Sequence, residues 1–274
     1  MKRIALFLMT NIGVLVIISL LVNVFNVHPL LHRNGLDLNR FLIFSAIVGF
    51  TGSFVSLFLS KFMAKMAYGI KAIQQPCDPH EMWIYETVRR LAKEAGIGMP
   101  EVGIYRSPEP NAFATGWNRN NALVAVSTGL LERMNREEVE AVLGHEISHV
   151  SNGDMVTLAL IQGVVNTFVV FISRIVAQVA ATAMSRGDDR GRENFSYGIY
   201  FVVSIVMELV LGIFASMIVF WFSRRREFRA DAGSARLVGA PKMIAALQRL
   251  RSLQGAPVDN RAPAMATMKI SHRG

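Results

Sequence analysis

The 274-residue chain is 52% hydrophobic but only 18% charged, and its net charge is +9. A soluble domain of this size usually has roughly a quarter of its residues charged, so the composition argues against an ordinary soluble protein. From Ser223 onward, eleven Lys and Arg accompany three Asp and Glu. A tail beside anionic lipid explains this charge more simply than nucleic acid does, so we expect a bilayer and no nucleic acid as partner. The single cysteine, Cys77, excludes an internal disulfide and a cysteine zinc cluster.

Four hydrophobic stretches are long enough to cross about 30 Å of hydrocarbon as helices: 4–25, 41–60, 155–173 and 197–222. The first has no small-residue cleavage site after it, so we expect an uncleaved anchor. The last two are joined by a polar turn at 184–196. Their length favours membrane spans, and a helical hairpin buried in protein is the alternative.

Two charged residues lie in or beside these last stretches. Arg174 directly follows the third stretch, and Glu208 lies near the middle of the fourth. Counted from the start of the third stretch and the end of the fourth, their depths differ by less than about 10 Å. We therefore expect that Arg174 either pairs with Glu208 or extends to the far membrane interface.

Basic residues cluster at 2–3, 61–71 and 224–229, with only Arg33 and Arg40 between the first two stretches. The positive-inside rule then places both termini and the region 61–154 in the cytoplasm. The sequence divides into two N-terminal spans (1–63), a protease domain (64–154), a transmembrane or membrane-associated hairpin (155–222) and a C-terminal cytoplasmic part (223–274).

The segment 76–154 has the signals of a mixed α and β domain. Asp78 and Pro79 predict the start of a helix that ends near Gly96. Short runs rich in β-formers at 101–107 and 122–128 flank PNAFATGWNRNN, which indicates a hairpin or a paired edge strand. Asn135 and Glu138 then form a capping-box pattern that predicts a second helix through VLGHEISHV.

This second helix carries a metal-binding pattern. A spacing of four residues puts His145 and His149 on one helical face, where both imidazoles can reach one Zn²⁺ ion. Glu146 lies beside them and is suited to take a proton from the attacking water. The motif alone is suggestive, because H-E-x-x-H also arises by chance. Its place in a properly capped helix strengthens it.

A catalytic zinc needs a third protein ligand. Of the remaining histidines, His28 and His32 are expected across the membrane, and the better candidate is acidic. Glu227 and Asp231 lie four residues apart on a helix that continues from the fourth stretch. Glu227 would bind one zinc ion per chain, and Asp231 would accept the free N–H of a ligand histidine. The alternative is that both acids pair with the neighbouring arginines.

The segments HEISHVSNGDM, NAFATG, LIQGVVNTFVVFISRI and SRRREFRADAGSARLVGAPKMIAALQRL resemble the HtpX family of bacterial membrane metalloproteases, which is related to the type I CAAX prenyl proteases. The resemblance implies an α-helical membrane protein with about four transmembrane helices and a cytoplasmic α+β gluzincin-like zinc metallopeptidase domain. It also implies zinc ligands at His145, His149 and Glu227 and a general base at Glu146. The implied substrates are misfolded or damaged membrane proteins of the inner membrane under heat or envelope stress, with other quality-control proteins as partners.

The NAFATG segment, with Asn111, Ala112, Phe113 and Gly116, is expected either to shape the substrate cleft or to be an ordinary hairpin loop. The family pattern continues with a histidine–proline segment, whereas His272 is followed by arginine here, so no residue that stabilises the oxyanion is identified. The alternatives to a quality-control protease are a CAAX-type prenyl-protein protease, a non-catalytic scaffold with a vestigial zinc site and, least consistent, a small-molecule transporter.

Overall fold

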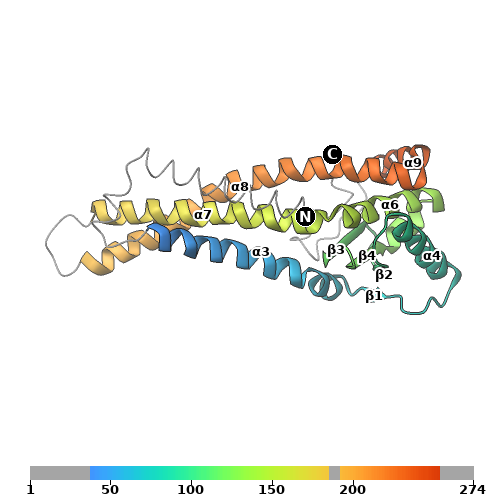
Figure 1. Ribbon diagram of the computed structural model, residues 1–274, viewed down its shortest axis with the longest axis horizontal. Helices are drawn as coiled ribbons and strands as arrows, with labels where there is room; N and C mark the ends of the chain where they lie inside the picture. Colours follow the sequence, from blue (N-terminus) through green and yellow to red (C-terminus); the bar gives the residue numbers. More distant parts are fainter. Residues whose placement is uncertain (1–37, 185–191, 254–274) are drawn as a thin grey trace. The chain divides into compact units, whose positions relative to one another are not determined.

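The computed structural model describes residues 38–184 and 192–253. The expected first span at 4–25 and the histidines His28, His32 and His272 lie outside these ranges. The chain divides into two compact units, one from Met1–Val55 and Leu158–Trp221 and the other from Ser56–Thr157 and Phe222–Gly274. Figure 1 labels most elements of both units.

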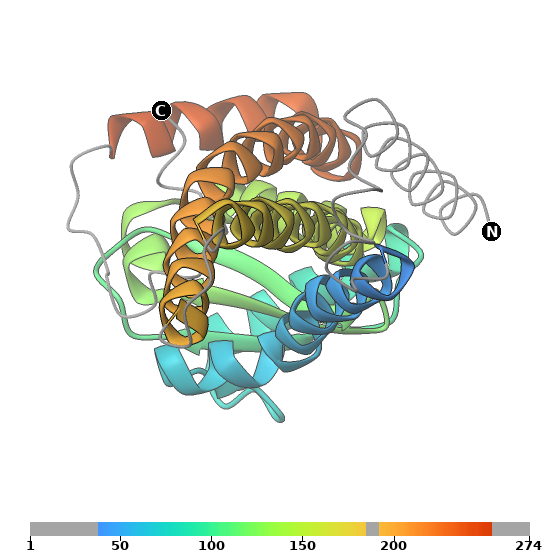
Figure 2. The same cartoon turned by 90° about the vertical axis from the view of Figure 1, so that its left-hand side faces the viewer.

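Three of the described helices are long and apolar enough to cross a membrane. They are α3 (Leu38–Tyr68), α7 (Asp154–Met184) and α8 (Arg192–Val238). The three contain the second, third and fourth hydrophobic stretches of the sequence, and the long helices α7 and α8 agree with the expected spans. Figure 2 looks nearly along α7, with α3 in blue and α8 in orange beside it.

Within the first unit, α3 and α7 approach closely at glycines. A methyl group added at Gly49 would lie 2.6 Å from the backbone nitrogen of Thr167, and one added at Gly163 would lie 2.6 Å from the Phe50 ring. Small residues allow helix backbones in membranes to pack this closely. The rings of Phe41 and Phe171 extend the contact, with centroids 6.3 Å apart.

Of the two alternatives for Arg174, the pairing with Glu208 is wrong. Arg174 donates from Nη1 to the Tyr200 hydroxyl at 3.3 Å, and its guanidinium lies 5.5 Å from the Phe44 ring centroid. Tyr200 precedes Glu208 by eight residues, which is about 12 Å along a helix. The register of α7 against α8 therefore places a tyrosine, and not the glutamate, opposite the arginine.

The second unit is built on a four-stranded sheet with the order β1-β2-β4-β3. The strands are β1 (Lys71–Ala72), β2 (Glu101–Tyr105), β3 (Ala112–Asn118) and β4 (Asn121–Ser127). β2 and β4 are parallel, whereas β1 with β2 and β3 with β4 are antiparallel. The PNAFATGWNRNN segment thus supplies a paired strand at one end of the described sheet, as expected.

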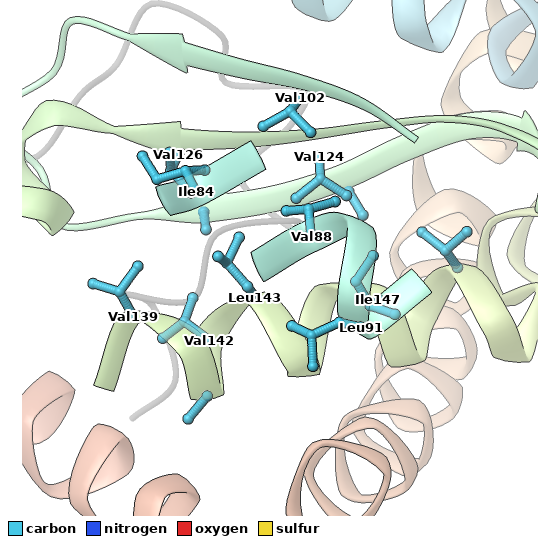
Figure 3. Packing of buried hydrophobic residues seen from close by; sticks show 14 of the residues in the cluster. Ile84, Val88, Leu91, Val102, Val124, Val126, Val139, Val142, Leu143 and Ile147 are labelled. Atoms are coloured by element: carbon cyan, nitrogen blue, oxygen red, sulfur yellow. The ribbon is translucent and has the colours of Figure 1, made fainter. Parts of the chain in front are cut away.

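Helices α4 (Pro79–Glu94) and α6 (Arg136–Asn152) pack on the sheet, and α5 (Thr128–Arg133) and α9 (Ala240–Ser252) complete the unit. Figure 3 shows the core between the strands and these helices. Apolar side chains at helical spacing form it, because that spacing puts them on one face of each helix. They include Ile84, Val88 and Leu91 from α4 and Val139, Val142, Leu143 and Ile147 from α6, packed against Val102, Val124 and Val126 of the strands.

The two helices begin where the sequence predicts. The Asp78 carboxylate accepts from the backbone N–H groups of His80 and Glu81 at the start of α4. At the start of α6, Asn135 and Glu138 bond each other's backbone N–H groups in a complete capping box. These contacts satisfy donors that have no partner inside a helix, and they fix the point from which α6 carries its motif into the core.

Candidate metal centre

Helix α6 brings its motif into the buried part of the second unit. His145, Glu146 and His149 have relative exposures of 1%, 4% and 9%. Ionisable side chains are rarely buried this deeply unless they are paired or bind a metal. The helix ends at Gly153, which takes a left-handed conformation with φ of 63°. That conformation suits glycine, and it allows the chain to restart at once as α7.

The last part of α8 lies against α6 along small residues. The Ser234 hydroxyl donates to the Ala141 carbonyl at 2.7 Å. A methyl group at Gly233 would lie 2.5 Å from Ser148 Oγ, and one at Gly144 would lie 2.9 Å from Ser234 Oγ. Because these positions carry almost no side chain, α8 approaches α6 closely enough for Glu227 to reach the histidines.

Three potential ligand atoms meet at this place. The Nε2 atoms of His145 and His149 lie 3.0 Å apart, and each lies 3.3 Å from Oε2 of Glu227. Zinc bound tetrahedrally at about 2.0–2.1 Å from its ligands separates neighbouring ligand atoms by about 3.3 Å. The triangle therefore has the dimensions of three corners of a tetrahedral zinc site, and these three residues form the metal-binding grouping among the described residues.

Each imidazole is oriented by a carboxylate on its other nitrogen. Nδ1 of His145 lies 2.7 Å from Asp231 Oδ1, and Nδ1 of His149 lies 2.8 Å from Asp154 Oδ2. An ionised carboxylate only accepts hydrogen bonds, so Nδ1 of His149 donates its proton to Asp154, whereas Asp231 makes a close ion-pair contact with Nδ1 of His145. In the neutral tautomer the Nε2 atom of each histidine has a free lone pair. The two Nε2 atoms and the Glu227 carboxylate are then three acceptors directed at one point, which fits a cation.

Asp154 is the site residue that the sequence interpretation missed, although it ends the stretch VLGHEISHVSNGD. Its carboxylate is 3% exposed, and its backbone carbonyl accepts from Nη1 of the buried Arg226 at 3.4 Å. The sequence signal for Asp154 was an acid directly after the glycine that ends the helix. The left-handed Gly153 turns the chain so that this acid comes back to the histidine one turn earlier.

The electrostatics of the centre also fit a cation. Burial lowers the pKa of His149, but hydrogen bonds to Asp154 and Glu227 and the charges of Glu146 and Glu227 outweigh it, and they raise the pKa to about 9. The surplus of negative charge thus holds a second proton on this imidazole at neutral pH when no metal competes. A bound metal takes the place of that proton.

The expected cleft residues all belong to β3 or to the residue before it. Asn111 is buried, its N–H donates to the Ser127 hydroxyl and its carbonyl accepts from the Ser127 N–H. Ala112 belongs to the core shared with α6, whereas Phe113 faces the other side of the sheet, with its ring 5.5 Å from that of Tyr68. Gly116 has φ of 141° beside a bulge, where a methyl group would lie 2.4 Å from the Asn121 carbonyl.

Comparison with known proteins agrees with this architecture. The model of peptidase family M48 matches residues 79–272. The Protease HtpX homolog of Thiobacillus denitrificans is 56% identical over 264 residues, which cover 96% of this chain and 89% of the relative. Protease HtpX of Nitrosococcus oceani is 58% identical over 252 residues, covering 91% and 83%. The crystal structure of S. mikatae Ste24p shares the fold, with a TM-score of 0.51, 16% identity and coverage of 97% of this chain and 63% of that one.

Long apolar helices, an α+β unit and two histidines with a glutamate held around one point define a membrane-bound metalloprotease. The sequence identity with the HtpX relatives, over nearly the whole chain, narrows this class to one family. The chain belongs to peptidase family M48 and, within it, to the HtpX proteases.

Proposed function

We propose that the protein is a zinc-dependent endopeptidase of the bacterial inner membrane that degrades misfolded or damaged membrane proteins under heat or envelope stress. The observation that carries the proposal is the triangle of His145, His149 and Glu227, with ligand atoms 3.0–3.3 Å apart and both imidazoles oriented by carboxylates. One zinc ion per chain fits this nitrogen and oxygen donor set.

Glu146 is the general base in this proposal. When bound, a zinc ion would polarise the scissile carbonyl and activate a water molecule. Glu146 follows His145 on the same helix, is 4% exposed and is close enough for its charge to raise the pKa of His149. A carboxylate there can accept the proton of the attacking water and then deliver it to the leaving amine. Asp231 and Asp154 hold the two imidazoles in place during both transfers.

The substrate chain binds as an extended strand beside β3. This strand ends the described sheet and packs beside α6, so a chain added to it would run past the metal site. Binding through main-chain hydrogen bonds depends little on side chains. Such a mode suits a protease that must accept many damaged proteins.

The first test separates metal binding from proton transfer. The full chain in detergent, carrying Glu146→Gln, is expected to retain one zinc ion per chain but to lose at least about a hundredfold of its casein cleavage, because the amide cannot take a proton. Zinc is measured by elemental analysis and cleavage by peptide release. Glu137→Gln, at an exposed acid in the first turn of α6, is the matched control and should cleave normally.

Three outcomes would count against the proposal. Normal cleavage by the Glu146→Gln variant would remove Glu146 from the mechanism. Zinc that stays bound after His149→Ala or Glu227→Ala substitution would show that the metal lies elsewhere. A prenyl-protein substrate cut in preference to unfolded protein would favour the CAAX-type alternative.

A further inference from the structure

Arg174 is a charged side chain that the proteolytic site does not use. It belongs to α7, in the unit that contains the apolar helices, and it is only partly buried. Among the described residues it contacts the Tyr200 hydroxyl at 3.3 Å and the Phe44 ring centroid at 5.5 Å. Neither contact neutralises its charge, although an unneutralised arginine in a membrane helix is costly.

Other polar groups of α7 and α8 also lack partners. Among the residues described, Nε of Arg174 and the hydroxyls of Ser173 and Ser204 are buried with no hydrogen-bond partner. Ser204 follows Tyr200 by four residues, so it lies on the same face of α8, one turn along. A guanidinium has five N–H donors, so one hydrogen bond to Tyr200 leaves donors for an anionic group with several acceptor oxygens.

The positions of these residues near the ends of the hydrophobic stretches indicate what that anion is. Arg174 directly follows the apolar stretch 155–173, which is about 28 Å long as a helix and therefore about as thick as the hydrocarbon. Tyr200 and Phe44 lie three residues inside the ends of their own stretches, and the exposed Tyr197 precedes Tyr200 on α8. Tyrosines and snorkelling arginines gather where hydrocarbon meets head groups.

We propose that Arg174 and Tyr200 form a binding site for the phosphate of an anionic phospholipid at the membrane face that lies toward the C-terminal end of α7. The Phe44 ring supports the guanidinium from one side, and the Tyr200 hydroxyl fixes one of its nitrogens. The phosphodiester accepts from the accessible guanidinium donors and from the Tyr200 hydroxyl, while the acyl chains lie along α3 and α8, many of whose side chains are exposed at these levels.

The test uses the full chain in detergent with added phosphatidylglycerol, and it measures by native mass spectrometry the affinity for the first bound lipid. Arg174→Gln should weaken this binding about tenfold, because a charge-assisted hydrogen bond to phosphate is lost. Tyr200→Phe keeps the ring and the fold but loses the hydroxyl, and it should weaken binding about threefold. Arg251→Gln, at an exposed arginine of α9, is the control and should change nothing.

Two further arms identify the ligand. Phosphatidylcholine should bind more weakly than phosphatidylglycerol, because its choline offsets the phosphate charge. Inorganic phosphate at the same concentration should not displace the lipid. Unchanged lipid affinity in both Arg174→Gln and Tyr200→Phe would overturn the proposal, and so would displacement by inorganic phosphate.

Discussion

At the scale of single residues, the metal centre depends on two acids that contact the ligand histidines but would not bind the metal themselves. Asp231 lies one turn beyond Glu227 on α8, whereas Asp154 begins another helix. Both place a carboxylate within 2.8 Å of a histidine Nδ1. A carboxylate there fixes the tautomer and makes the opposite nitrogen a stronger ligand.

Replacement of Asp154 by asparagine should therefore weaken metal binding. The amide keeps the size of the side chain but removes its charge, so we expect a loss of about 10-fold to 100-fold in zinc affinity. Competition with a chromogenic zinc chelator measures the change directly. Glu94→Gln, at a surface acid that pairs with Arg90, is the control. An Asp154→Asn variant with wild-type zinc affinity would show that the contact with His149 is only structural.

At the scale of elements, the close contact of α6 with α8 decides whether the third ligand reaches the site. Gly233 has no room for a methyl group, which would lie 2.5 Å from Oγ and 2.8 Å from Cβ of Ser148. The Cβ atom cannot rotate away, so Gly233→Ala should push α8 from α6 and displace Glu227. Gly212, on the same helix, has nothing within 4 Å of an added methyl group.

The two glycine variants thus form a matched pair. In a helix interior alanine is favoured over glycine by roughly 1 kcal/mol, so propensity alone would make both variants more stable. We expect Gly212→Ala to bind zinc normally and Gly233→Ala to lose most of its zinc affinity and its casein cleavage. Zinc content and thermal unfolding of both variants check this. Equal zinc binding by the pair would mean that the contact tolerates a larger separation.

The helices and strands also show which features of the fold could be predicted from the sequence. Helix starts at Asp78 and Asn135 follow from local side-chain to backbone bonds, so the sequence predicted them correctly. The parallel pairing of β2 with β4 and the register of α7 against α8 depend on contacts between distant residues. The Tyr200 partner of Arg174 could not be predicted for the same reason. Asp231 was predicted from its spacing to Glu227, and Asp154, only five residues after His149, had a local signal that was overlooked.

At the scale of the whole molecule, the distribution of basic residues predicts which side of the membrane holds the protease unit. Cys77 offers a test, because it is the only cysteine of the sequence and it is exposed in the segment between α3 and α4. If 61–154 is cytoplasmic, a membrane-impermeant maleimide should leave Cys77 unlabelled in intact bacterial spheroplasts and label it after permeabilisation.

A second cysteine is needed to test which part of the chain lies on the other side of the membrane. Gly35 lies in the predicted loop between the first two hydrophobic stretches, so Gly35→Cys in a Cys77→Ser background should label in intact spheroplasts. Labelling of Cys77 from outside, with protection of the cysteine at position 35, would reverse the orientation. The metal centre shares the second unit with Cys77, so this reversal would place proteolysis outside the cytoplasm. The charge pattern opposes that arrangement, because the eleven basic residues after Ser223 would then have to cross the membrane.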